Sequence, residues 1–185
     1  MNGLRQPSVS WPARGWCIAL SLVFLLAFSY LMNAPGLSTS GTEFQRLSGA
    51  PTFDFMFGGY DAARMEQVLS AAGDRGRSVY RNFMLLDVLF PAIYALFWTG
   101  VFVRGTAGLT RRMQWIGVVP VVTAGIDYAE NLFIWLAVRG YPEIPAWSAP
   151  VASLATRAKG ASTIILLVCA IGLLAAAVIR RIRRP

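Results

Sequence analysis

Four long apolar runs alternate with polar segments along the 185-residue chain. Each run approaches or exceeds the roughly 18 to 20 apolar residues that a helix needs to cross a bilayer. The length of the chain suits one compact domain. The pattern therefore predicts an all-α integral membrane bundle of four transmembrane helices, with spans at 15–34, 81–103, 113–138 and 160–180.

The longest polar segment, 35–80, is predicted to be an extracytoplasmic loop with one short amphipathic helix over 61–72. Asp61 suits the N-cap of this helix, and Gly73 suits the position after its last turn. The apolar positions between them follow helical spacing and are Ala62, Met65, Val68, Leu69 and Ala72. We interpret this helix as a cover that packs on the bundle or on the membrane surface; a substrate gate is the alternative.

Basic residues are distributed unevenly among the segments outside the spans. The two ends of the chain and the 104–112 turn, with Arg180 at the end of the last span included, hold nine arginines and no acidic residue. The other two loops, with Arg81 included, hold eight basic residues together with six acidic ones. Under the positive-inside rule, both termini are then cytoplasmic, in a multi-pass protein of the plasma (bacterial inner) membrane. The segments outside the spans are a cytoplasmic N-terminus at 1–14, the outer loop at 35–80, a cytoplasmic turn at 104–112, a second outer loop with the start of the last helix at 139–159, and a cytoplasmic tail at 181–185.

The first apolar run follows a basic segment, which is also typical of a signal peptide. The run is about 18 residues long, however, which is enough for a span, and Met32-Asn33-Ala34-Pro35 is a poor cleavage site. An uncleaved first transmembrane helix is therefore the better interpretation.

Composition supports a membrane protein and excludes several classes of site. Hydrophobic residues make up 56% of the chain, and the mean hydropathy is +0.53. The net charge of +8 does not indicate nucleic-acid binding, because the basic residues cluster at the ends of the apolar runs. Membrane lipid is the expected partner. The chain has no histidine, which excludes His-ligated haem, His zinc sites and His triads.

The two cysteines, Cys17 and Cys169, lie inside apolar runs without CxxC spacing and are interpreted as packing residues. A hard cation held by clustered oxygens is a weaker alternative, because no second DxD-type motif supports it. We therefore expect neither a cofactor nor a metal site.

Polar residues interrupt two of the predicted spans. Asp127, Glu130 and Asn131 share one helical face in the third span. The second span contains Asp87, and Pro91 four residues later cannot donate a hydrogen bond to the Asp87 carbonyl, so a kink is expected there. An ionisable residue inside a span costs roughly 3 kcal/mol on insertion scales, so these side chains need partners.

The helical rise of about 1.5 Å per residue places the polar residues of three spans at a similar depth. Asp87 lies about 9 Å from the outer end of its span, and Glu130 and Asp127 lie about 13 and 18 Å from the end of theirs. Thr156 and Lys159 lie about 10 to 15 Å along the last helix. We therefore expect one buried cluster in the outer half of the bundle: Asp87, Asp127, Glu130, Asn131, Thr156 and Lys159.

Lys159 is the expected positive partner of the acids, with Arg157 in reserve. The acids outnumber the bases, so at least one acid is expected to be poised as a general acid, a general base or a proton carrier. The candidates for this role are Asp127, Glu130 and Asp87. A purely structural ion-pair and amide network is the alternative.

The same residues carry a resemblance to a known group of proteins. The pattern resembles small bacterial four-helix membrane proteins that lack an assigned activity, and it comprises Tyr80-x-x-Phe83-x-x-x-Asp87-x-x-Phe90-Pro91-x-x-Tyr94, Asp127-x-x-Glu130-Asn131 and Thr156-x-x-Lys159. This resemblance covers the last two-thirds of the chain and implies no catalytic role. A looser likeness is to the four-helix sterol-isomerase and sigma-2-receptor group, which also has acids in an outer membrane pocket. The aspartate motifs of prenyltransferases and CDP-alcohol phosphotransferases are not found.

Four functions agree with these observations. The first is binding of a small amphipathic or cationic ligand, or of a lipid headgroup, by the cluster, with Tyr94 as an aromatic wall. The second is an enzyme for a lipid-soluble substrate that uses Glu130 or Asp127 as acid or base. The third is a proton- or cation-coupled carrier, which would be a homo-oligomer because four spans enclose little pathway. The fourth is a structural network only.

Overall fold

The computed structural model describes residues 11–107 and 109–182, and these residues form helices, turns and loops without any strand. Four helical stretches are long and apolar enough to cross a membrane: Gly15–Asn33, Ala62–Gly105, Trp115–Arg139 and Ser148–Arg180. The predicted all-α architecture with four such helices is therefore confirmed. The elements in chain order are η1 (Trp11–Ala13), α1 (Gly15–Asn33), α2 (Gly41–Ser48), η2 (Phe53–Phe55), α3 (Ala62–Asp87), α4 (Phe90–Gly105), α5 (Arg111–Gln114), η3 (Trp115–Val118), α6 (Val119–Arg139) and α7 (Ser148–Ile182).

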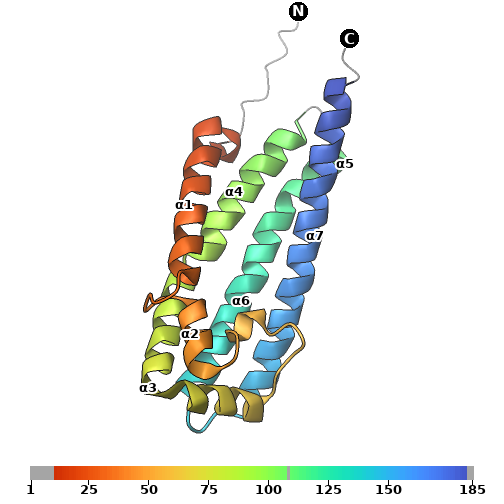
Figure 1. Ribbon diagram of the computed structural model, residues 1–185. Coiled ribbons are helices and arrows are strands. Elements are labelled where there is room, and N and C mark those ends of the chain that lie inside the picture. The colour runs from red at the N-terminus through yellow and green to blue at the C-terminus, as the bar shows by residue number, and fades with distance from the viewer. Residues whose placement is uncertain (1–10, 108, 183–185) are drawn as a thin grey trace, which may run out of the picture.

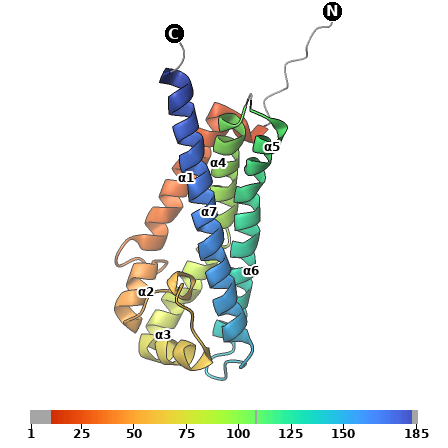
Figure 2. The same ribbon diagram turned by 90° about the vertical axis from the view of Figure 1, so that its right-hand side faces the viewer.

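The long helices α1, α4, α6 and α7 lie side by side, and α2, η2 and the first part of α3 cover one end of them (Figure 1). Helix α6 packs along α7, and α1 packs along α4. Helix α4 lies close to η1 and to α1 at Gly100, where an added Cβ would collide with the Pro12 carbonyl oxygen of η1 and lie 2.8 Å from Ile18 Cγ1 of α1. From that contact α1 leans away from α4 towards its Asn33 end (Figure 2).

Helix α3 contains a sharp bend at the position where the sequence predicts a helix end. Asp61 caps the helix, because its Oδ1 accepts a hydrogen bond from the Arg64 backbone N–H at 2.8 Å. Gly73 has φ +62° and ψ −175°, a backbone conformation that is essentially restricted to glycine. The part before Gly73 lies across the end of the bundle, and the part after it runs into the bundle (Figure 1).

A second break lies between α3 and α4, inside the predicted second span. Asp87 is the last residue of α3, and Pro91 is in the first turn of α4. The Asp87 carbonyl, which Pro91 cannot satisfy, accepts a hydrogen bond from Asn131 Nδ2 at 3.3 Å. The expected kink is present, and a side chain of the neighbouring α6 satisfies its free carbonyl.

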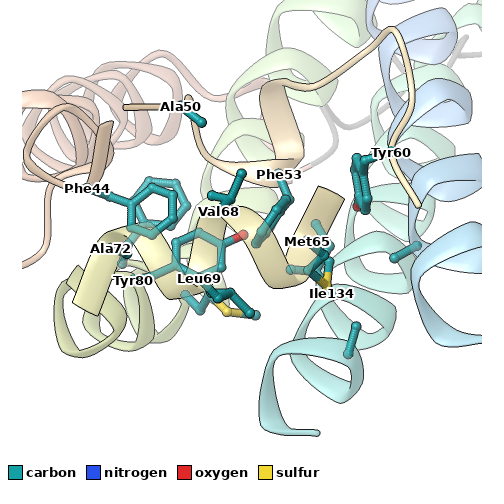
Figure 3. Close-up of a cluster of buried hydrophobic side chains, with 14 of the residues drawn as sticks. Phe44, Ala50, Phe53, Tyr60, Met65, Val68, Leu69, Ala72, Tyr80 and Ile134 are labelled. Atoms are coloured by element: carbon teal, nitrogen blue, oxygen red, sulfur yellow. The ribbon is translucent and has the colours of Figure 1, made fainter. Parts of the chain in front are cut away.

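The 35–80 segment is more structured than the sequence predicts, because α2 and η2 lie where a loop is expected. Ser40 caps α2 by accepting a hydrogen bond from the Glu43 backbone N–H at 3.4 Å. A hydrophobic core lies between α2, η2 and α3 (Figure 3), where the Phe44 and Tyr80 ring centroids are 4.6 Å apart. We call residues 40–73 the cap. Its buried core holds η2 in a defined position against the bundle.

Candidate functional site

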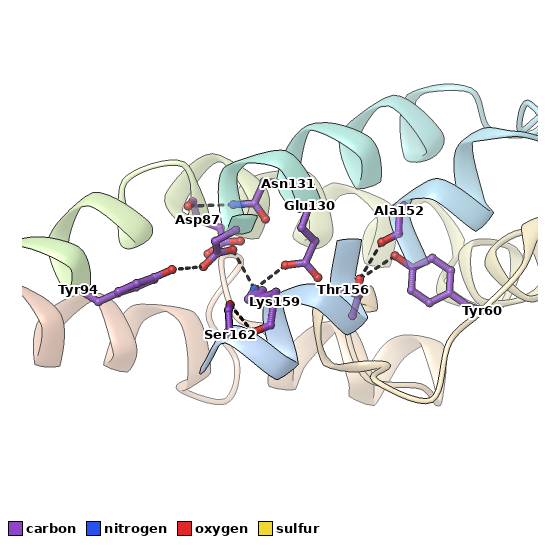
Figure 4. Close-up of polar contacts among 10 residues, drawn as sticks. Tyr60, Asp87, Tyr94, Glu130, Asn131, Ala152, Thr156, Lys159 and Ser162 are labelled. Carbon is purple, nitrogen blue, oxygen red and sulfur yellow. Dashed lines mark hydrogen bonds and ion pairs between the residues drawn. The ribbon is translucent and has the colours of Figure 1, made fainter. Parts of the chain in front are cut away.

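A buried ion-pair cluster joins α6 to α7 at the level of the cap. Lys159 Nζ lies 3.0 Å from Asp127 Oδ1 and 2.7 Å from Glu130 Oε2 (Figure 4). Asp127 and Glu130 are about one helical turn apart on α6, so both carboxylates lie on the face of α6 that is turned towards α7. The sequence-based prediction that Lys159 is the positive partner of both acids agrees with this geometry. Arg157, the reserve partner, makes no ion pair among the described residues.

Hydrogen bonds connect this cluster to the two halves of the second span. The Tyr94 hydroxyl of α4 donates to Asp127 Oδ2 at 3.0 Å. Asn131 binds the backbone of Asp87 at the α3–α4 break. Asp127 is therefore held by a lysine on one oxygen and by a phenol on the other, which fixes the orientation of its carboxylate.

The cap is attached to α7 through Tyr60, a residue that the sequence did not single out. The Tyr60 hydroxyl lies 3.2 Å from the Thr156 hydroxyl, and its backbone N–H donates to Ser153 Oγ at 3.0 Å. Burial raises the pKa of Tyr60, so the phenol stays protonated. Thr156 in turn donates to the Ala152 carbonyl at 3.1 Å. Thr156 thus positions the cap.

A cavity of about 320 Å³ lies beside the cluster, with α1 on one side and α7 on the other. Most of its wall is apolar, and its charged residues are Asp54, Asp87, Asp127 and Lys159. Phe55 and Phe57 line it while remaining 57% and 48% exposed, so the cavity reaches the surface beside η2. The other lining residues are Leu25, Ser29, Met32, Asn33, Phe83, Phe90, Tyr94, Trp98, Thr123, Thr163, Leu166 and Leu167.

Asp54 is the acid that sequence reasoning missed. It lies in η2, is 5% exposed, and its Oδ1 has no hydrogen-bond partner among the described residues. Burial raises the pKa of the Asp54 carboxyl, and the positive charge of Lys159 offsets part of that rise. The available signal was local: Asp54 is the only charged residue in the aromatic stretch Phe53-Asp54-Phe55-Met56-Phe57.

The seven predicted site residues fall into two groups. Asp87, Tyr94, Asp127 and Lys159 line the cavity. The other three, Glu130, Asn131 and Thr156, lie behind this wall and bind its members or the cap. Glu130 is fully buried, and its carboxylate points towards Lys159 and Thr156 (Figure 4). Asp127 is therefore better placed than Glu130 to meet a molecule in the cavity.

Negative groups outnumber positive ones around the cavity. Asp54, Asp87, Asp127 and Glu130 are buried near one another, and Lys159 is the single base among them. Lys159 already contacts two of the four carboxylates, so Asp54 and Asp87 remain without a cationic partner among the described residues. The described residues also include no group of three or more Cys, Asp or Glu side chains placed to hold a metal ion. The arrangement suits attraction of a positive group that carries an apolar body.

Comparisons with known protein families, with curated proteins and with solved structures gave no match to this chain.

Proposed function

We propose that the protein binds a lipid-soluble organic cation, an amphiphile with a basic amine head, inside the membrane. The observation that carries this proposal is the excess of carboxyl groups in the wall of an otherwise apolar cavity. Asp54, Asp87 and Asp127 would receive the amine, and the aromatic and aliphatic wall would receive the hydrocarbon body. A cavity of about 320 Å³ suits a small amphiphile.

The charge balance supports a cation in preference to an anion or a neutral lipid. A buried carboxylate without a partner is costly, and a protonated amine would relieve this cost for Asp54 and Asp87 together. The aromatic side chains of Phe90 and Trp98 line the cavity and add a favourable environment for the alkyl groups of an ammonium ion. An anionic headgroup would instead meet three carboxyl groups and a lysine that is already paired.

The position of the cavity supports entry from the bilayer. Its walls include α1 and α7, which are two of the helices apolar enough to cross a membrane. With the positive-inside orientation, the protein lies in the plasma membrane with both termini cytoplasmic and the cavity in the outer half. An amphiphile in the outer leaflet then reaches the cavity sideways, with its amine at the depth of the carboxyl groups.

A second candidate function is acid–base catalysis on a lipid-soluble substrate. The observation in its favour is that Asp127 lines the cavity while bound to both the Tyr94 hydroxyl and Lys159, an arrangement able to pass a proton. Under this alternative, Asp127→Asn abolishes turnover and leaves ligand affinity largely intact. A coupled carrier would instead show pH-dependent flux in proteoliposomes that the same substitution removes.

The binding proposal is tested with N,N-dimethyloctylamine and its neutral isostere 2-methyldecane, using protein in lipid nanodiscs and thermal unfolding as the readout. The amine is expected to raise the melting temperature in proportion to the logarithm of its concentration, and the isostere is not. Asp54→Asn and Asp87→Asn should each weaken the binding of the amine by about tenfold, which corresponds to the loss of one charge-assisted hydrogen bond.

The matched control is Asp74→Asn, because Asp74 is exposed and pairs only with Arg77. Asp54→Asn also provides an internal check on the ligand-free protein. Burial raises the pKa of the Asp54 carboxyl above its ordinary value of 3.8, so ionisation of this group favours the unfolded state of the wild type as the pH rises above 3.8. The Asn variant lacks this ionisation and is therefore expected to become more stable than the wild type over that pH range. Equal shifts with amine and isostere, or an unchanged amine affinity in Asp54→Asn, would refute the proposal.

A further inference from the structure

A second hollow lies on the surface between α3 and α6, separate from the cavity. It consists of two adjoining depressions of about 490 and 380 Å³, which share Arg81, Met84 and Trp135. None of their lining residues lines the cavity described above. The inner depression is almost entirely apolar, whereas the outer one is lined by three arginines. We call the two together the α3–α6 groove.

The polar end of the groove carries surplus positive charge. Arg77 is paired with Asp74 at 2.6 Å, but Arg81 and Arg139 form no ion pair among the described residues. Both of these arginines are exposed. The Arg139 guanidinium lies over the Trp135 ring, 5.1 Å from its centroid, which holds it beside the groove. The groove thus presents two uncompensated guanidinium groups from two helices.

The whole groove has about the length of one membrane leaflet. Its wall on α6 runs from Arg139 at the polar end inward to Tyr128, a separation of 11 residues or about 16 Å of helix. Half of a hydrocarbon core about 30 Å thick is about 15 Å. Leu85, Val88 and Leu132 are exposed along this stretch, so an acyl chain can lie against them.

Basic and aromatic residues meet at the outer ends of the second and third predicted spans, where lipid headgroups are expected. Trp135 and Tyr141 are residues of the type that anchor proteins at the membrane interface, and both line the outer depression with the arginines. A phosphate at this level would find guanidinium donors from α3 and α6 on either side of it. A zwitterionic headgroup would bring its own ammonium ion to the same arginines.

We propose that the α3–α6 groove is a binding site for one anionic phospholipid. Arg81 and Arg139 hold the phosphate, and an acyl chain extends along Met84, Leu85, Val88 and Leu132. This site is independent of the amine-binding cavity, because the two share no lining residue and have opposite charge preference. Asn131, whose side chain binds the Asp87 carbonyl at the α3–α4 break, also lines the groove. The bound lipid would therefore cover Asn131.

The proposal is tested by native mass spectrometry of the detergent-purified protein, with phosphatidylglycerol and phosphatidylcholine of identical chains added in competition. One bound phosphatidylglycerol per chain is expected, and phosphatidylcholine should not displace it. Arg81→Gln and Arg139→Gln should each lower the affinity for phosphatidylglycerol about fivefold. This factor corresponds to the contribution of about 1 kcal/mol that one basic residue makes to binding at an anionic membrane surface. Soluble glycerol phosphate should bind far more weakly, because it lacks the acyl chain.

Arg64→Gln is the matched control, because Arg64 is exposed on α3 outside the groove and bonds only Gln67 and the helix cap. Unchanged lipid-free melting temperatures establish that the variants are folded. Equal binding of both phospholipids, an equal loss in Arg64→Gln, or a lipid-free dimer that buries the groove would overturn the proposal.

Discussion

At the scale of single residues, Lys159 compensates the negative charge of the buried acids on α6. It lies between Asp127 and Glu130, and both carboxylates are buried. Removal of one partner from a buried ion pair is far more costly than removal of the whole set, because the remaining charge stays buried without compensation. The stability of the α6–α7 interface should therefore depend on Lys159 more than on either acid alone.

Lys159→Met is expected to lower the free energy of unfolding by about 3 to 5 kcal/mol, because it leaves two carboxylates uncompensated. Glu130→Gln should be milder, since Lys159 keeps Asp127 as its partner. The triple variant Lys159→Met, Asp127→Asn, Glu130→Gln should recover most of the loss. Denaturant titration in detergent micelles, followed by circular dichroism, measures all three. A triple variant no more stable than Lys159→Met would contradict this assignment.

The sequence predicted these ion pairs because helical spacing and depth are local quantities. Asp127 and Glu130 share a face by their separation alone, and the rise per residue brings Lys159 to their level. The contacts of Asp54 and Tyr60 were not predictable in this way. Tyr60 meets Ser153 and Thr156, which are 93 and 96 residues later, and no local pattern encodes contacts of that range.

At the scale of elements, the α3–α4 break is an arrangement of a proline, a free carbonyl and an amide. Pro91 leaves the Asp87 carbonyl without a helical partner, and Asn131 supplies one from α6. The break therefore links the second span to the third at the depth of the cavity. Its Asp87 side chain lines the cavity, whereas Asn131 lines the α3–α6 groove.

Asn131→Leu is expected to destabilise the protein by about 1 to 3 kcal/mol, the cost of a buried carbonyl without a partner. In the Pro91→Ala background the same change should cost much less, because the substituted residue regains a backbone N–H that can donate to the Asp87 carbonyl. A double-mutant cycle measured by unfolding in detergent quantifies this coupling. Additive effects of the two substitutions would mean that Asn131 stabilises the fold in some other way.

Element prediction succeeded where the signal was periodic or involved a proline or glycine. The helix between Asp61 and Gly73 and the break at Pro91 were both predicted from single-residue chemistry. Helix α2 was missed, although Ser40-Gly41-Thr42-Glu43 has the spacing of a capping box. Its eight residues are mostly polar and are stabilised by packing with Phe44 in the cap core, which only the tertiary structure provides.

At the scale of the whole molecule, four crossings return the chain to the side from which it started. The beginning of α1 and the end of α7 lie at the same end of the bundle, opposite the cap (Figure 1). Four described arginines belong to elements at that end: the N-cap of α1, the last turn of α4, α5 and the last turn of α7 contain Arg14, Arg104, Arg111 and Arg180, respectively. Architecture and charge thus support the proposed topology, with the cap and the cavity outside.

Reporter fusions test this topology. Alkaline phosphatase fused after Pro185 is expected to be inactive, and phosphatase fused after Pro145, between α6 and α7, is expected to be active. Green fluorescent protein at the same two positions should give the opposite pattern. Phosphatase activity at the C-terminus would invert the proposed orientation and place the cap in the cytoplasm.

The ion pairs between α6 and α7 also bear on how the protein enters the membrane during synthesis. Lys159 follows Glu130 by 29 residues, so at 5 to 20 residues per second the two acids of α6 wait about 1.5 to 6 s for their counter-charge. The transfer of a span with two uncompensated carboxylates into lipid has an unfavourable free energy. We therefore expect α6 to stay at the translocon until α7 has been made, and the two helices to enter the bilayer together as one hairpin.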